Sequence, residues 1–172
     1  MLRHLVAEVR RDPSPTGLFW SATDPDFPSS IGTLTMAEAV AGLDELIQLG
    51  LAEGDVQRVG RGAVISRIYP TLTGVLEMEA LEILLAQAAP LLRSLLSQPR
   101  DVVDISRFQD HVAVGDVSLP TAEANFQLRF LRDLGFVSYR SSFETGGRLL
   151  LDVRVTPKGR EWLIDHYLPT TA

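Results

Sequence analysis

Two stretches of this chain read almost alike, and their spacing predicts the fold. Residues 34–39 read Leu-Thr-Met-Ala-Glu-Ala, and residues 119–124 read Leu-Pro-Thr-Ala-Glu-Ala. The same offset of 85 residues continues without a gap and gives 11 identities across residues 34–78. Ordinary composition predicts only about three identities over such a length. A repeat of this kind predicts two tandem copies of one domain.

The repeated stretch is expected to form an amphipathic helix in each copy. Thr35 and Glu38 have the spacing of a capping box, and Ser118 is expected to cap the helix of the second copy. The repeated leucines lie on one helical face. Gly50 and Gly135 follow, at the point where a left-handed residue commonly ends a helix.

A β-hairpin is expected after each of these helices. Residues 51–58 and 63–69 are predicted to pair in the first copy, and residues 136–142 and 149–155 in the second. A Thr-x-x-Gly element and another helix follow each hairpin. The copies differ upstream: the second has a candidate helix over 104–112, whereas the first has a loop-rich segment with a short strand or core plug at Leu18-Phe19-Trp20.

The order of helix, hairpin, Thr-x-x-Gly and helix resembles the winged-helix superfamily. Residues 155–163 read Val-Thr-Pro-Lys-Gly-Arg-Glu-Trp-Leu and look much like the segment after the wing in many bacterial winged-helix regulators. The resemblance implies an α+β, mostly helical chain of tandem winged-helix domains, each with helices and a β-hairpin wing. We place the first domain at 1–79 and the second at 80–172.

Two helices are expected to open the copies, over 2–11 and about 78–98. The second is apolar on nearly every side, so more than one partner must bury it. It either joins the two modules within one chain or forms a homodimer interface. Its candidate interface residues are Leu84, Leu91 and Leu95.

Composition and motifs argue against several functions. The chain has no cysteine and no long apolar segment, so we expect a cytoplasmic protein without a membrane span. Enzyme signatures such as Gly-x-Ser-x-Gly and the P-loop are absent, and His4, His111 and His166 lack metal-ligand spacing. We therefore expect no enzymatic activity, no cofactor and no metal.

Charge separates the two copies. Residues 1–85 hold 6 Arg and 12 Asp or Glu, which gives −6, while residues 86–172 hold 10 basic and 10 acidic residues, which gives zero. In the second copy a helical projection turns Asn125, Arg129 and Arg132 partly outward, and these residue types can read base edges. Arg140 and Arg148 flank its hairpin and could contact phosphates.

Two functions remain open from the sequence. The first is a DNA-binding protein, a bacterial transcriptional regulator that uses the second winged helix. The alternative is a non-enzymatic adaptor, because tandem winged helices resemble the architecture of kleisin-interacting subunits of SMC complexes and of an ESCRT-II subunit. The first copy suits protein contact or homodimerisation, since its helix is expected to expose Asp44, Glu45 and Gln48, and the two acidic groups repel phosphate.

Overall fold

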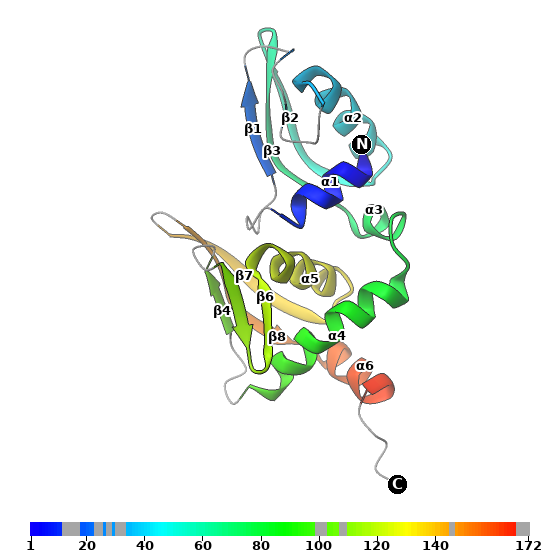
Figure 1. Cartoon of the computed structure of the whole chain (residues 1–172), viewed down its shortest axis with the longest axis vertical. Coiled ribbons are helices and arrows are strands. Elements are labelled where there is room, and N and C mark those ends of the chain that lie inside the picture. Colours follow the sequence, from blue (N-terminus) through cyan, green and yellow to red (C-terminus); the bar gives the residue numbers. More distant parts are fainter. Residues whose placement is uncertain are drawn as a thin grey trace. The chain divides into compact units, whose positions relative to one another are not determined.

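The computed structural model describes residues 1–11, 18–22, 26, 29, 34–98, 103–106, 110–144 and 147–167 (Figure 1). The side chains of residues 18–20, 22, 103–106, 141–144, 147–149 and 151 lie outside this description. The chain divides into two compact units, Met1–Ala80 (unit 1) and Leu81–Ala172 (unit 2). This division falls one residue from the boundary that the repeat predicts. Both units are α+β.

Unit 1 is a three-stranded antiparallel sheet with three helices. Its elements are α1 (Leu2–Val9), β1 (Leu18–Ala22), α2 (Met36–Gln48), β2 (Ala52–Val59), β3 (Gly62–Pro70) and α3 (Leu72–Leu76). The strand order is β1-β3-β2, so the predicted hairpin is confirmed and the segment at residues 18–20 is a strand. The core is formed by apolar side chains with no exposed area, among them Leu5, Leu43, Ile65 and Ile68.

Unit 2 has the same sheet and one additional hairpin. Its elements are α4 (Leu81–Ser97), β4 (Val103–Ser106), β5 (His111–Val114), β6 (Val117–Pro120), α5 (Thr121–Asp133), β7 (Val137–Glu144), β8 (Gly147–Val155) and α6 (Pro157–Tyr167). The large sheet has the order β4-β8-β7, and β5 pairs with β6 alone. The core is built from fully buried leucines, among them Leu92, Leu128, Leu131 and Leu163.

The offset of 85 residues holds for the structure, including regions without sequence identity. Shifting the bounds of α2, β2 and β3 by 85 gives the bounds of α5, β7 and β8. Leu18 pairs with Ile68 in unit 1, and Val103 pairs with Val153 in unit 2. The helix-ending glycines have positive φ angles of 69° and 78° at the predicted positions. The two units are therefore two copies of one architecture.

The Thr-x-x-Gly element forms the same joint in both units. Thr71 bonds the carbonyl of Leu51 through its N–H (3.0 Å) and the carbonyl of Gly50 through its hydroxyl (2.7 Å). The hydroxyl also accepts the N–H of Gly74 at 3.1 Å, which caps α3. Thr156 repeats all three bonds in unit 2. One threonine thus ties the helix end, the hairpin and the following helix together.

An ion pair across a β-bulge also recurs, with its charges exchanged. In unit 1, Arg67 on β3 pairs with Asp55 on β2, and its Nε donates to Oδ2 at 3.0 Å. In unit 2, Asp152 stands at the position of Arg67 and accepts from Nε of Arg140 at 2.8 Å. Arg67 and Asp152 both have positive φ angles, 58° and 56°, where the strand carries one extra residue.

Two sequence predictions are wrong. The predicted helix at 104–112 is instead β4 and β5, separated by residues outside the description. Ser118 lies in β6, and Pro120 is the N-cap residue of α5. The apolar helix expected at about 78–98 is α4, which begins at Leu81 and packs on β8, α5 and α6 of unit 2.

The helix-turn-helix of a winged helix is not formed ahead of α5. That motif places one helix before the recognition helix, whereas here β6 runs directly into α5 (Figure 1). The corresponding segment of unit 1 lies largely outside the described residues. No described helix is long and apolar enough to cross a membrane.

Candidate interaction surfaces

The two equivalent helices differ in how much surface they expose. In α2 one face is buried on β2 and β3, and the other carries exposed residues from Ala37 to Gln48. In α5 nine of the thirteen residues are buried, and only Arg132 and Asp133 are exposed. The reason is local, because α4, β5, β6 and β7 all pack on α5. An exposed helical surface is therefore a property of α2.

The candidate base-reading residues of α5 do not form an outward row. Asn125 is 6% exposed, so the expectation that it faces outward is wrong. Arg129 is half-buried, and burial lowers the pKa of its guanidinium, with a smaller contribution from the charge of Arg132. Arg132 alone of the three is exposed. A helix that reads base edges needs several exposed polar side chains. Of the three candidate residues on α5, only Arg132 meets this requirement.

The cations of α5 and β7 are paired with acidic or aromatic groups. Arg132 donates to Asp133 at 3.0 and 3.2 Å, and its guanidinium carbon lies 5.1 Å from the ring centre of Tyr139. Arg140 is held by Asp152. Burial raises the pKa of Tyr139, so its hydroxyl stays protonated. Carboxylates thus interrupt the positive potential that phosphate contact requires.

Arg148 lies on β8, and its side chain is outside the description. The apolar residues proposed for an interface are buried: Leu84, Leu91 and Leu95 are 2%, 1% and 5% exposed in the chain. They offer almost no surface to a partner, and an interface at these residues stays a prediction. Their burial has a simple cause, because α4 is covered by its own unit on several sides.

The acidic residues of α2 remain at the surface. Glu45 and Gln48 are exposed, while Asp44 is half-buried and forms an ion pair with Arg58 of β2. The capping box is present: Thr35 accepts from the N–H of Glu38, and the Glu38 carboxylate accepts from the N–H of Thr35 at 2.9 Å. These bonds lower the pKa of Glu38.

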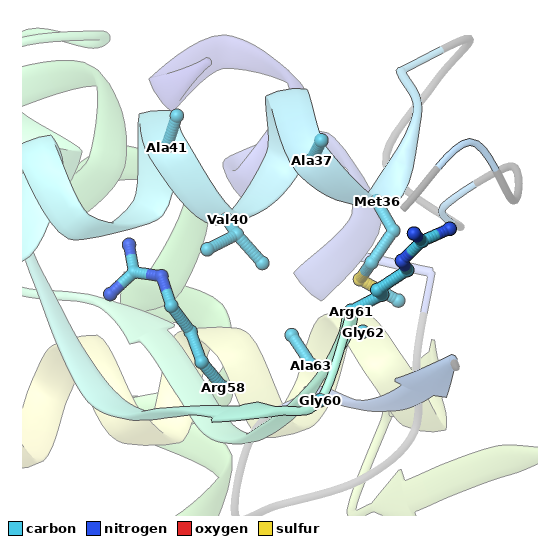
Figure 2. A pocket seen from close by; sticks show the side chains of 9 residues that line it. All are labelled: Met36, Ala37, Val40, Ala41, Arg58, Gly60, Arg61, Gly62 and Ala63. Atoms are coloured by element: carbon cyan, nitrogen blue, oxygen red, sulfur yellow. The ribbon is translucent and has the colours of Figure 1, made fainter. Parts of the chain in front are cut away.

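A hollow of about 210 Å³ lies between α2 and the turn of the β2–β3 hairpin (Figure 2). It is lined by four residues of α2 and five of the hairpin. Val40 points from the helix toward the hairpin, and Ala63 points from β3 toward the helix (Figure 2). The space exists because most of the lining residues are glycine or alanine.

Two arginines line this hollow, and none of the nine lining residues is acidic. Arg58 reaches alongside α2, where Asp44 holds it. Arg61 lies at the exposed turn and forms no ion pair with a described residue. Val59, which lies between them in sequence, is 58% exposed but does not line the hollow. An apolar hollow therefore meets a cationic rim.

The sequence analysis missed this hollow because it placed residues 59–62 only as the connection between two paired strands. The usable signal was the set of small residues: Ala37 and Ala41 on one helix face, with Gly60, Gly62 and Ala63 opposite. Within the described residues, no group of three or more His, Asp or Glu side chains could hold a metal ion. No family model, curated protein or solved structure matches the chain.

Proposed function

We propose that this chain is a non-enzymatic protein-binding adaptor and that unit 1 supplies the contact surface. The observation that carries the proposal is the hollow between α2 and the β2–β3 hairpin. It combines apolar residues of α2 and β3 with two arginines that line the same hollow. Protein interfaces use such arrangements, in which an apolar anchor fills a hollow and polar groups surround it.

We also propose that each unit is a divergent winged helix. The support is the order of helix, strand, helix, hairpin and helix, together with the strand order β1-β3-β2 and its counterpart β4-β8-β7. The β5–β6 hairpin occupies the place of the first helix of a helix-turn-helix in unit 2. A winged helix without that helix keeps its scaffold but loses the usual support of a DNA-reading helix.

A pull-down with matched variants tests the adaptor proposal. Ala41 and Ala113 are both exposed alanines, but only Ala41 lines the hollow. A partner captured from extracts of the native cells should be retained by the wild type and by Ala113→Glu, and lost by Ala41→Glu. Equal capture by the two variants, or no stoichiometric partner, would count against it. Sedimentation of the purified chain shows whether the partner is a second copy.

DNA binding through unit 2 is the second candidate. The observation that favours it is the exposure of the two paired arginines, since the side chains of Arg132 and Arg140 are 40% and 75% exposed. A DNA phosphate can replace Asp133 or Asp152 as their partner. Fluorescence anisotropy with mixed-sequence duplexes at low salt tests this. Arg132→Gln and Arg140→Gln should weaken binding and reduce its salt dependence.

A further inference from the structure

We propose that the hollow of unit 1 binds one apolar side chain of an acidic peptide segment, with Arg61 contacting the adjacent carboxylate. The proposal rests on the adaptor function and names the chemistry of its partner. The volume of about 210 Å³ is below the roughly 300 Å³ at which pockets for drug-sized ligands begin. It suits a single large side chain, not a nucleotide or a cofactor.

The floor of the hollow selects an apolar group. Val40 and Ala63 approach from opposite sides, and Met36 closes the end near the turn (Figure 2). Val40, Ala63 and Met36 are already 7%, 3% and 2% exposed, so the apolar surface that a peptide anchor would cover belongs to the exposed Ala37 and Ala41 of α2.

The rim selects a negative charge. Unit 1 holds six arginines and eleven acidic residues in 1–80, a net charge of −5, yet both charged residues of the lining are arginines. Arg61 is the cation available to a ligand, because Asp44 already engages Arg58. A carboxylate next to the apolar anchor would therefore meet Arg61 at the mouth of the hollow.

Comparison with unit 2 shows that this chemistry is not part of the shared scaffold. The positions of Arg58 and Arg61 correspond to Phe143 and Gly146, so neither cation recurs. Val40 corresponds to Asn125, which makes the equivalent floor position polar. The scaffold folds without these residues, and their combination in unit 1 indicates binding.

A short acidic segment fits this surface better than a nucleic acid does. The exposed face of α2 carries Glu38 and Glu45, and Glu53 lies on β2. A duplex presents one negative charge per roughly 1.7 Å of its axis, so its phosphates would meet these carboxylates as well as Arg61. A single carboxylate can contact Arg61 without approaching these acidic residues. A phosphate group, in contrast, makes no favourable contact with the apolar floor.

Three small probes test the inference by NMR on the full chain. They share a phenyl ring and differ in charge: 3-phenylpropanoate, 3-phenylpropanamide and 3-phenylpropylammonium. Amide shifts in residues 37–41 and 58–63 should be largest with the carboxylate, smaller with the amide and smallest with the ammonium. Shifts elsewhere, no saturable shift at millimolar concentration, or equal binding of all three probes overturns the inference. The inference is also overturned if the amide signals of these residues shift only when a DNA duplex is added.

Variants at the rim separate charge recognition from apolar burial. Arg61→Gln should weaken binding of the carboxylate probe about two- to five-fold and leave binding of the amide probe unchanged. The control variant Arg3→Gln, at another exposed cation, should change the binding of neither probe. Asp44→Asn releases Arg58 and should strengthen the carboxylate by a similar factor. If Arg61→Gln has no effect, the carboxylate assignment is wrong. If the probes fail but Ala41→Glu still abolishes partner capture, the adaptor function stands without this inference.

Discussion

The glycine of the Thr-x-x-Gly element should not tolerate even a methyl group. A Cβ at Gly74 would lie 2.9 Å from the carbonyl carbon of Leu51 and closer still to its oxygen. Neither atom belongs to a flexible side chain, so α3 and the end of the α2–β2 connection would have to separate. That movement also strains the bond from the N–H of Thr71 to the Leu51 carbonyl. Gly74→Ala is therefore an overpacking substitution against backbone.

The expected cost follows from two opposing contributions. Overpacking of this kind costs about 1–3 kcal/mol, while alanine in place of glycine gains at most about 1 kcal/mol in a helix. Because Gly74 lies in the first turn of a five-residue helix, little of that gain applies. We expect a net loss of about 1–3 kcal/mol. For a unit of this size the loss lowers the melting temperature by roughly 4–8 °C per kcal/mol.

Gly42 provides the matched control. It lies inside α2, and the nearest atom that its Cβ would meet is the end of the flexible Met1 side chain, at 2.6 Å. Gly42→Ala should therefore leave unit 1 as stable as the wild type or more stable by up to about 1 kcal/mol. Urea-dependent hydrogen exchange, resolved over residues 36–70, measures both variants within unit 1. If Gly74→Ala unfolds at the same urea concentration as the wild type, the proposed joint is wrong.

Three other contacts give measurable outcomes. The Glu38 carboxylate accepts from the backbone N–H of Thr35 and from its hydroxyl, and these bonds lower the pKa of Glu38. Their contribution to the stability of α2 is present above the ordinary pKa of 4.5 and is lost as pH falls through the lowered value. The urea midpoints of wild type and Glu38→Gln should therefore differ near pH 7 and converge in acid, whereas a constant difference contradicts this. Asp55→Arg places two guanidinium groups across the bulge and should destabilise unit 1 by about 0.5–1 kcal/mol. The double variant Asp55→Arg with Arg67→Asp has the charges of unit 2 at these positions and should recover the lost stability. If the urea midpoint of the double variant does not recover, the ion-pair reasoning is refuted. Burial raises the pKa of Tyr139 above 10.0, so its contribution to the stability of unit 2 is present below that pH and is lost as pH rises through the raised value. In an alkaline titration the tyrosine absorbance should therefore show a change at higher pH than an ordinary tyrosine gives. This change should disappear in Tyr139→Phe, and its persistence would assign it to another tyrosine.

Local signals with fixed spacing made much of the fold predictable. The capping box at Thr35, the glycines at 50 and 135 and both long hairpins appear where the sequence places them. Each depends on contacts between residues close in sequence, so one chain suffices to recognise it. The β5–β6 hairpin had such a signal as well: Val112 and Val114 alternate with exposed residues before a turn at Gly115. The predicted helix at 104–112 overlooked that alternation.

Surface assignments depend on tertiary packing, and the sequence did not determine them. The outward placement of Asn125 assumed that α5 buries one face, whereas α4, β5, β6 and β7 surround it. The apolar helix at 81–97 had two open interpretations, and in the structure four of its leucines, Leu84, Leu91, Leu92 and Leu95, are buried, while Leu81 is exposed. The hollow of unit 1 needs α2 and the hairpin to face one another, so no single segment of sequence indicates it.

The exchanged ion pair shows which properties of the repeat the architecture requires. Both units have opposite charges across the same bulge, but unit 1 places arginine at the positive φ angle and unit 2 places aspartate there. Aspartate tolerates that conformation better than arginine does. The geometry therefore requires opposite charges at the two positions, but either position can hold the positive charge. Because the exchange also moves the exposed cation from β3 in unit 1 to β7 in unit 2, the same scaffold presents different charges. The recognition that we propose for unit 1 accordingly depends on residues that the repeat does not preserve, and Arg61 beside the hollow is such a residue.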